Sequence, residues 1–377
     1  MERCCTRYTQ LKVNSEKIDI KEVKVSTYIV PTDGPESDGT IEWNSTTLVL
    51  VVIKAGEKSG TGYSYADISS AYSIERNLKK IIIGKNALDI PSVLKSMTDS
   101  VRNNGNCGIT AMAISAVDNA LWDLKAKILD VPVVLLLGKV RDDLPAYGSG
   151  GFTSYPIKKL QNQLAGWAEK GIKQVKMKVG REPDKDVYRV KKAREAVGDK
   201  VALFVDANGA YNAKQALDMA RRFEEFGVRW FEEPVPSSDL KGLYFIRHYA
   251  PNGMNIAAGE YGYNLSYFEQ MISAGSVDVL QADATRCGGI STFLKAGYTC
   301  EAHQLPFSSH CAPSLHLHAA LALPSFFTAE YFYDHVRIEE MLFDGVQQPV
   351  NGALRADLSR PGLGLEFKFR DGEKYKV

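Results

Sequence analysis

Charged side chains recur at nearly even intervals through the second half of the chain, each where a short apolar segment ends. Successive gaps span 20 to 28 residues, about the length of one β-strand and one α-helix together. The series consists of Lys178, Asp206, Glu232, Glu260, Asp283, His310 and Glu330. A closed barrel of alternating strands and helices gathers successive strand ends around one mouth, so this spacing predicts that residues distant in the sequence share one site.

Apolar runs and amphipathic stretches alternate from residue 141 onward, as they do in a sheet of parallel strands joined by helices. Eight strands are expected, at residues 146–149, 174–179, 202–206, 230–232, 256–260, 278–282, 306–309 and 326–331. An open, doubly wound sheet would require a GxGxxG loop after its first strand, which YGSGGFTSY does not provide. We therefore predict an α/β fold with a TIM-like barrel over residues 141–345.

Residues 19–140 have a different texture and predict a separate α+β domain. Residues 21–30 alternate between apolar and polar side chains, and residues 46–54 are rich in β-branched side chains, so an antiparallel strand pair is expected. The polar segment between them, residues 31–45, is expected to be a flexible loop that could cover a site. Helical patterns follow, the last of them running from Gly108 to Leu129 with a broad apolar surface.

The two ends of the chain are expected to lie outside these domains. Residues 1–18, which include the adjacent Cys4 and Cys5, are interpreted as a disordered or non-native segment. Residues 346–377 are rich in Gly and Pro, and we expect them to return and pack on the N-terminal domain.

Net charge and cysteine content restrict the partners and the compartment. With 46 Lys and Arg residues against 45 Asp and Glu residues, the formal charge of +1 gives no long-range attraction for nucleic acid or anionic membranes. Apolar segments are too short for a membrane span, and the N-terminus lacks the apolar middle of a signal peptide. The six cysteines form no CxxC pair, so we expect reduced thiols in a cytoplasmic protein.

Three carboxylates follow three consecutive predicted strands, in the sequences FVDANGAY, WFEEPV and AAGEYG. Asp206, Glu232 and Glu260 would then be neighbours, and three such charges repel one another unless a cation neutralises them or protons are retained. All-oxygen ligation with open positions for water and substrate favours Mg²⁺. Taken singly, each residue also fits a structural role, as a helix N-cap, a partner of a helix dipole or a solvated loop residue.

Two lysines stand two residues apart in QVKMKVG, so Lys176 and Lys178 project from the same face of a strand, which in a barrel is the interior. Neighbouring ammonium groups and a dication lower one another's pKa, which can leave a neutral amine able to accept a proton near neutral pH. Lys178, nearer the C-terminal end of the strand, is the better candidate base. The alternative is a surface strand that carries two solvated lysines.

Asp283 and His310 end two strands on the other side of the predicted barrel. A carboxylate at Nδ1 orients an imidazole ring and raises its basicity, which leaves Nε2 free to exchange a proton. We predict that this pair is a second proton carrier opposite Lys178. Glu330, at the end of the last strand, could hydrogen-bond a substrate carboxylate if it were protonated, or could be the ionised partner of a nearby lysine.

The motifs KMK, DANGAY, FEEP, GEY, QADATRCGG and SSH, in this order, resemble the mandelate racemase subgroup of the enolase superfamily, over most of the chain from Lys21 onward. The resemblance implies a (β/α)7β barrel that the N-terminal domain closes as a cap. It implies Mg²⁺ as the cofactor, bound by Asp206, Glu232 and Glu260. Proteins of this type commonly form dimers or octamers, so a homo-oligomer is expected.

The same resemblance implies roles for the remaining site residues. Lys178 and the His310–Asp283 pair would be the two acid/base groups. Lys176 would hold the substrate carboxylate and lower the pKa of Lys178, and Glu330 would be an electrophilic partner. The common step of the family is abstraction of the proton α to a carboxylate, so a small-molecule carboxylate is the expected substrate.

The fate of the resulting enediolate separates two reactions. If Lys178 and His310 face opposite sides of the α-carbon, one removes and the other returns a proton, which gives racemisation or epimerisation. If a hydroxyl stands on the β-carbon, the second group expels it as water and gives a 2-keto-3-deoxy acid. Some related dehydratases carry a histidine two residues beyond the metal aspartate, where this chain has Asn208, which we expect to contact the substrate.

Residues 31–45 and 63–72 correspond to the capping loops that set specificity in the family, and together they are rich in Ser, Asp and Tyr. This composition suits a polyhydroxylated acid better than an aryl one, so dehydration of an acid sugar is expected, with racemisation or epimerisation as the alternative.

A non-catalytic metal-binding barrel is a third possibility, which the retained proton carriers disfavour. A muconate-type cycloisomerase would carry lysine in place of Asp283 and would lack His310. Arg286 either contacts an anionic end of the substrate or simply begins a helix.

Overall fold

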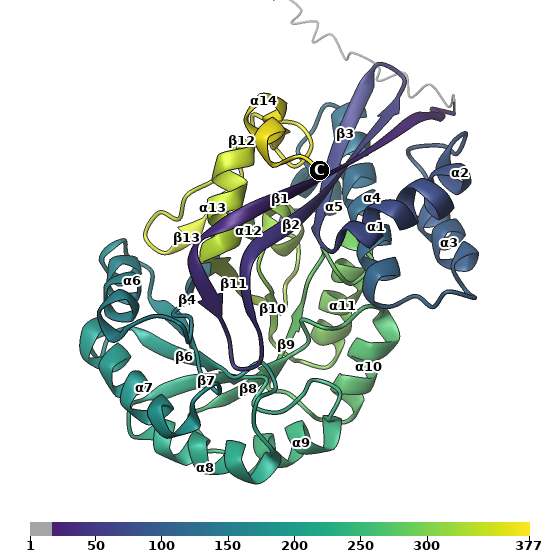
Figure 1. Ribbon diagram of the computed structural model, residues 1–377. Coiled ribbons are helices and arrows are strands. Elements are labelled where there is room, and N and C mark those ends of the chain that lie inside the picture. Colours follow the sequence, from purple (N-terminus) through teal and green to yellow (C-terminus); the bar gives the residue numbers. More distant parts are fainter. Residues whose placement is uncertain (1–16) are drawn as a thin grey trace, which may run out of the picture.

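The computed structural model describes residues 17–377, and its larger part is a closed barrel of eight parallel strands (Figure 1). Each barrel strand pairs with its neighbour in chain order, and the last pairs with the first to close the ring. The strands are β4 (Leu144–Gly150), β5 (Gln174–Lys178), β6 (Ala202–Asp206), β7 (Val228–Glu232), β8 (Asn255–Ala258), β9 (Val279–Ala282), β10 (Phe307–Ser309) and β11 (Phe326–Phe332). Every predicted barrel strand is present, and both ends of each lie within two residues of those expected. The predicted fold class is confirmed.

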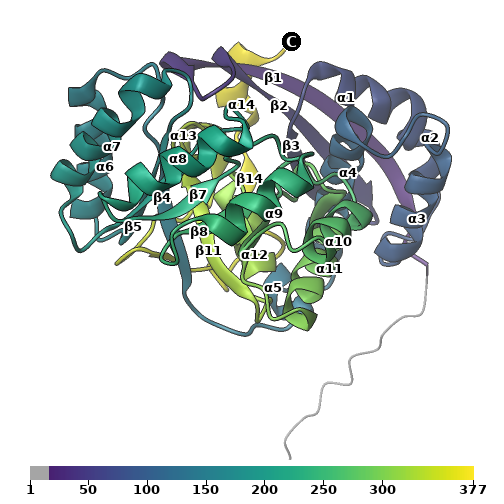
Figure 2. The same ribbon diagram turned by 90° about the horizontal axis from the view of Figure 1, so that it is seen from below.

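Helices cover the outside of the barrel, as Figures 1 and 2 show. They are α6 (Ile157–Glu169), α7 (Pro183–Val197), α8 (Ala213–Glu224), α9 (Leu240–Tyr249), α10 (Leu265–Ser273), α11 (Gly289–Ala302) and α12 (Pro313–Ala320). In α6 the buried side chains of Leu160, Leu164 and Trp167 repeat at helical spacing and face the strands. Gly148 of β4 makes room for this contact, because a Cβ there would lie 2.4 Å from the Trp167 ring.

The barrel interior has an apolar layer and a charged layer. Tyr147, Phe204 and Trp230 form the apolar layer with two small side chains, and the last two rings stack with centroids 5.1 Å apart. Lys176, fully buried, lies with its Nζ 5.3 Å from the centre of the Tyr147 ring. This packing fills the barrel on one side of the charged residues, which therefore lie toward the opposite mouth.

The N-terminal domain is an antiparallel sheet covered by helices. Its sheet has the order β1 (Ile20–Ser37), β2 (Glu42–Ala55) and β3 (Lys58–Tyr65). Its helices include α1 (Ile68–Ser73), α3 (Ile90–Ser100), α4 (Gly108–Ile128) and α5 (Val133–Leu137), with the short turn α2 (Lys79–Ile82) between the first two. The predicted strand pair is confirmed, because residues 20–31 pair with residues 45–55, and α4 agrees with the last predicted helix.

One expectation for this domain was wrong, and one strand was missed. Residues 31–45 are not a flexible loop, because β1 continues to Ser37 and β2 begins at Glu42, which leaves only a short turn. Residues 58–65 form a third strand that the sequence did not suggest. The hairpin of β1 and β2 extends over the barrel mouth (Figure 1), and Gly39 at its tip approaches the loops after β5 and β6. A Cβ on Gly39 would lie 2.2 Å from the carbonyl oxygen of Ala207.

Helix α4 of the N-terminal domain caps the first turn of barrel helix α11. Ser115 Oγ accepts from the backbone N–H groups of Gly288 and Gly289, at 2.8 and 3.2 Å. Asn119 Oδ1 accepts from Ile290 N at 3.0 Å, and Asp118 Oδ2 accepts from Ser291 N at 2.9 Å. The first-turn N–H groups of a helix have no hydrogen-bond acceptor within the helix. Side-chain oxygens of α4 therefore provide the acceptors that a local N-cap residue usually provides.

The C-terminal part of the chain contacts both domains. After β11, helix α13 (Tyr333–Leu342) lies against the N-terminal sheet, where Tyr63 donates to Glu339 at 2.6 Å. The remaining short elements are β12 (Phe343–Asp344), β13 (Ala353–Leu354), β14 (Glu366–Phe367) and α14 (Phe369–Gly372). β13 pairs with β4, and Val377 N donates to Thr27 O of β1 at 3.0 Å. The expected disordered or non-native N-terminus falls, except for its last two residues, outside the described residues.

No helix within residues 17–377 combines the length and the apolar character that crossing a bilayer requires. The four cysteines in this range, Cys107, Cys287, Cys300 and Cys311, form no disulfide with one another.

Candidate active site

Three buried carboxylates lie on adjacent strands at the barrel mouth. Asp206 and Glu232 are the last residues of β6 and β7, and Glu260 follows β8 after a single glycine. One oxygen of each lies within 4.8 Å of the others, close enough for one cation to contact all three. The structure therefore brings together the three residues that the sequence proposed as metal ligands.

The glycine before Glu260 is required by the backbone. Gly259 has a φ of +136°, and a Cβ at this position would lie 2.0 Å from the carbonyl oxygen of Gln281 on β9. The close approach of the two strands therefore excludes any side chain here. The turn that results leaves the Glu260 side chain almost fully buried beside the other two carboxylates.

Burial and neighbouring charges act differently on these carboxyl groups. Burial raises the pKa of Glu232 well above its ordinary value, and the nearby Lys176 only partly opposes this. Burial also acts on Asp206, but Lys178 and Lys176 outweigh it and lower the pKa of Asp206. Glu233, next to Glu232, has a pKa raised well above its ordinary value by burial and by the carboxylate of Glu260. The repulsion between these buried carboxyl groups favours retained protons, and a bound cation would offset it in their place.

Both lysines of β5 point into the barrel, as their spacing predicted. Lys176 Nζ lies 2.6 Å from Glu232 Oε1 and 2.8 Å from Glu330 Oε1, and Lys178 Nζ donates to Asp206 Oδ2. Burial lowers the pKa of Lys178, but the surrounding carboxylates, Asp206 foremost, together outweigh burial and raise this pKa. The expected lowering of this pKa is therefore not produced by these contacts, because the carboxylate partner has a larger effect than the second lysine.

The His310–Asp283 pair has the expected geometry. His310 follows β10, Asp283 follows β9, and Asp283 Oδ2 lies 2.8 Å from Nδ1 of the imidazole. Thr285 N donates to the other carboxylate oxygen at 2.6 Å. Burial would raise the pKa of Asp283, but the bond and charge of His310 outweigh it and lower this pKa. The carboxylate thus stays ionised and fixes the ring, with Nε2 directed 3.4 Å from Glu260 Oε2.

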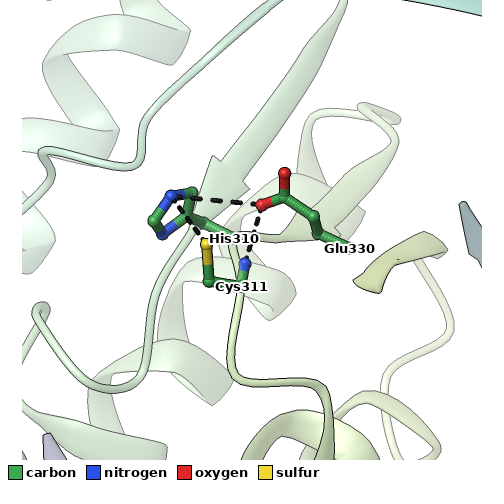
Figure 3. A group of neighbouring side chains, drawn as sticks. All are labelled: His310, Cys311 and Glu330. Carbon is green, nitrogen blue, oxygen red and sulfur yellow. Dashed lines mark hydrogen bonds and ion pairs between the residues drawn. The ribbon is translucent and has the colours of Figure 1, made fainter. Parts of the chain in front are cut away.

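Glu330 at the end of β11 is an ionised partner of Lys176. Ser149 Oγ donates to its Oε1 at 2.6 Å, and Cys311 N donates to its Oε2 at 2.8 Å (Figure 3). Burial would raise the pKa of Glu330, but Lys176, His310 and Lys178 outweigh it and lower this pKa. These contacts favour the second of the two roles considered from the sequence, an ionised partner of a lysine, over a protonated donor to the substrate.

A cavity of about 490 Å³ lies between the barrel mouth and the N-terminal domain, within the usual range for small-molecule sites. The barrel contributes Lys178, Asn208, Glu260, Arg286, His310 and Cys311 to its wall. The N-terminal domain contributes the polar side chains of Asp38, Thr46 and Asp67 and the apolar side chains of Ile41, Trp43 and Met112. The two segments expected to set specificity both reach the cavity, but its wall is less uniformly polar than their composition suggested.

Three residues of the site were missed or undervalued from the sequence. Arg286 Nη1 lies 3.2 Å from Glu260 Oε1, and its Nε lies 3.6 Å from Asp283 Oδ2, so it does more than begin a helix. Glu233 adopts a left-handed φ of +37° directly after β7. Cys311 adopts a φ of +51°, and its Sγ lies 3.1 Å from His310 Nε2. Strand periodicity cannot place the last two, because each follows the strand end at which the alternation stops.

A closed parallel barrel with three clustered carboxylates at its mouth and an antiparallel cap is the architecture of enzymes of the enolase superfamily. The chain belongs to the mandelate racemase/muconate lactonizing enzyme group of that superfamily. Residues 159–371 match the family model described as enolase C-terminal domain-like, and residues 21–138 match the mandelate racemase/muconate lactonizing enzyme N-terminal domain. The possibility of a non-catalytic barrel is not supported, since curated relatives include dehydratases and cycloisomerases.

Similar proteins cover nearly the whole chain. L-Talarate/galactarate dehydratase of Salmonella typhimurium is 32% identical over 359 residues, which are 92% of this chain and 88% of the relative. A mandelate racemase/muconate lactonizing enzyme-like protein from Rubrobacter xylanophilus superimposes with a TM-score of 0.93 at 50% identity, covering 95% of this chain and 100% of that one. A racemase from Streptomyces coelicolor, solved with bound magnesium, gives 0.90 at 30% identity, with 95% and 100% covered.

Proposed function

We propose that this enzyme abstracts the proton α to the carboxylate of an acid sugar and then expels the β-hydroxyl as water, giving a 2-keto-3-deoxy acid. The observation that carries the proposal is the placement of two proton carriers around one carboxylate cluster. Lys178 projects from β5 and His310 follows β10, and these strands are separated by β4 and β11 on one side and by β6 to β9 on the other. A substrate held at the cluster would have one group on each face.

Mg²⁺ is the proposed cofactor, held by Asp206, Glu232 and Glu260. The donors are all carboxylate oxygens, as hard divalent cations prefer. Glu260 Oε2 is buried and has no hydrogen-bond partner among the described residues, so it is free to bind a cation. When bound, the ion supplies positive charge at the substrate carboxylate, where negative charge develops as the proton leaves.

The chain's own side chains would move the protons. His310 Nε2 faces the cluster while Asp283 holds Nδ1, which suits transfer of a proton to or from the α-carbon. Lys178 can accept a proton only as a neutral amine, so this role requires Asp206 to serve the cation instead of Lys178. As an ammonium group it would instead protonate the departing hydroxyl. In either role of Lys178, one of the two residues takes the α-proton and the other protonates the hydroxyl. The protonated hydroxyl then leaves as water.

Two features support a hydroxylated acid as the substrate. Asn208 Oδ1 is buried and without a partner among the described residues, and Asn208 lines the cavity, so it can accept a hydrogen bond from a substrate hydroxyl. The dehydratase relative named above acts on sugar acids, as its name states. Racemisation or epimerisation is the second candidate, because the same opposed pair could return the proton to the other face.

We also infer a homo-oligomer, which sedimentation velocity would test.

A screen of aldonic and aldaric acids with Mg²⁺ in D₂O tests the proposal. Keto-acid formation from at least one acid is the expected result, with deuterium appearing at the α-carbon of recovered substrate when proton transfer is reversible. Exchange with inversion and without keto acid would establish the second candidate. Neither exchange nor keto acid across the panel would contradict both.

A further inference from the structure

Cys311 places a thiol beside the imidazole that we assign to proton transfer. The chain leaves β10 through two left-handed residues, Cys311 with φ +51° and Ala312 with φ +39°. Figure 3 shows the result, in which the Cys311 side chain turns back to the His310 ring and its backbone N–H reaches Glu330. The Sγ to Nε2 distance is 3.1 Å, and Glu330 Oε2 lies 4.0 Å from the same Nε2.

Sulfur, imidazole nitrogen and carboxylate oxygen together form the ligand set of a thiophilic cation rather than that of Mg²⁺. His310, Cys311 and Glu330 are all buried, and one donor atom of each lies within 4.8 Å of the others. With bonds of about 2.0 to 2.3 Å, neighbouring ligands of tetrahedral zinc stand roughly 3.3 to 3.6 Å apart. The distances at Nε2 bracket this spacing, so small side-chain rotations would complete the geometry.

Glu260 of the three-carboxylate site lies next to this group. Glu260 Oε2 is buried and lacks a partner among the described residues, and it lies 3.4 Å from His310 Nε2. Arg286 binds the other oxygen of this carboxylate at 3.2 Å, which leaves Oε2 directed toward the imidazole. This oxygen is assigned to Mg²⁺ above, so it is not counted as a ligand of the second cation, and a water molecule would complete a tetrahedral set.

We propose that His310 Nε2, Cys311 Sγ and Glu330 Oε2 bind a thiophilic divalent cation of the Zn²⁺ class, at a site that lies beside the three-carboxylate site and shares no ligand with it. On binding, the thiol releases its proton to solvent and the thiolate becomes a ligand. The cation occupies Nε2, the atom that the proposed function uses for proton transfer, so it inhibits the enzyme. The inhibition rests on the proposed function, whereas the binding does not.

Cd²⁺ reports thiolate ligation directly, through a ligand-to-metal absorption band in the ultraviolet. The titration uses the full chain with saturating Mg²⁺, in a background where Cys4, Cys5 and Cys107 are replaced by serine. These three are removed because Cys107 is exposed and the first two lie outside the described residues. We expect a band that saturates at one Cd²⁺ per chain. A Cd²⁺ ion confined to Asp206, Glu232 and Glu260 would have no sulfur ligand and would give no band.

Two further variants assign the sulfur. Cys311→Ser is expected to lose the band, while Cys300→Ser, which alters a buried thiol within α11, is expected to keep it. Far-ultraviolet circular dichroism checks that both variants fold. The proposal would be overturned if the protein that lacks only Cys4, Cys5 and Cys107 gave no band, or if folded Cys311→Ser kept the band. The first of these measurements does not depend on whether Cys311→Ser folds.

A turnover assay separates the binding from its consequence. With the acid identified in the D₂O screen, one equivalent of Zn²⁺ added to the Mg²⁺-loaded enzyme is expected to suppress turnover, and a chelator selective for Zn²⁺ should restore it. If no acid is turned over, the proposed function fails while the Cd²⁺ band still decides whether the site exists. A band together with unaffected turnover would show that His310 Nε2 is not the proton carrier, and would remove the inhibitory role.

Discussion

Asp283 Oδ2 lies 2.8 Å from Nδ1 of His310, and both side chains are buried at the barrel mouth. A carboxylate in this position fixes the ring orientation and stabilises the positive charge that the ring gains when Nε2 takes a proton. Asp283, at the end of β9, therefore supports the proton transfer that we propose for His310, at the end of the neighbouring β10.

Replacing Asp283 by asparagine tests this relationship. Asp283→Asn keeps the shape but removes the charge, so we expect kcat to fall by about 10² to 10⁴, the usual size of a general acid–base contribution. Steady-state kinetics over pH 6 to 9 measures the loss. Asp278→Asn is the matched control, because Asp278 precedes the same strand and pairs with Arg247 on the outer surface. Equal losses in the two variants would contradict a specific role for Asp283.

Lys178→Ala tests the opposed proton carriers. If His310 removes the proton from one face, the variant should still exchange the α-proton of one epimer with D₂O while losing overall turnover. Proton NMR of the recovered acid distinguishes the epimers. Lys185→Ala, which alters a lysine on the exposed surface of α7, should leave exchange and turnover unchanged. Retained turnover in Lys178→Ala would remove this lysine from the mechanism.

Glu232→Gln tests the cation site without relying on activity. A cation that binds only the folded protein raises the melting temperature with its concentration, so Mg²⁺ should stabilise the wild type. Glu232→Gln would lose one of the three proposed carboxylate ligands, so it should bind Mg²⁺ more weakly by calorimetry and show little thermal shift. Glu224→Gln, an exposed change at the end of α8, should behave as the wild type does. An unchanged affinity in Glu232→Gln would place Mg²⁺ elsewhere.

Gly289→Ala tests the contact between α4 and α11. Gly289 has a φ of +82°, and a Cβ there would lie 2.4 Å from Asp118 Cβ. Gly138 has a similar φ of +88°, but a Cβ there would meet nothing within 4 Å. Both alanine variants carry backbone strain of about 1 to 2 kcal/mol, so the extra fall in melting temperature of Gly289→Ala measures the lost interdomain contact. Equal melting temperatures would contradict close packing at this point.

We expect Asp118→Asn to change the pH dependence of the free energy of unfolding. Burial raises the pKa of Asp118 to about 7 against the opposing bonds from Ser291. Because this folded-state pKa exceeds the unfolded one, the folded state binds more protons between the two values, and stability falls as pH rises through that window. Asparagine does not titrate, so the free energy of unfolding of Asp118→Asn should rise relative to the wild type between pH 5 and pH 8. Urea unfolding at both pH values measures the difference, and a constant difference would show that Asp118 does not titrate there.

The barrel and the site could be predicted because one periodicity determines both. Each strand is short and apolar and ends near a charged residue, so the positions of Asp206 and Glu232 fix the strand ends and the grouping of side chains. The positions of Lys178, Asp283 and His310 followed from the same argument. The ion pair between Lys178 and Asp206 could not be predicted from the strand positions, because it depends on side-chain directions across neighbouring strands.

The N-terminal domain was predicted less completely because tertiary contacts override local composition there. β3 contains Gly60 and Gly62, which suggest a loop, yet Cβ atoms at these positions would lie within 2.4 Å of α4. The glycines are needed for the strand to lie against the helix. The hairpin after Val30 likewise contains Pro31 and Pro35, but pairing of Glu36 and Ser37 with β2 keeps the segment extended.

The capping of α11 by side chains of α4 also bears on how such proteins can diversify. A recombination event that exchanged the N-terminal domain for one without Ser115, Asp118 and Asn119 would leave the first turn of α11 without its hydrogen-bond partners. Grafting experiments that aim to transfer specificity should therefore move the hairpin of β1 and β2 alone and retain the native α4.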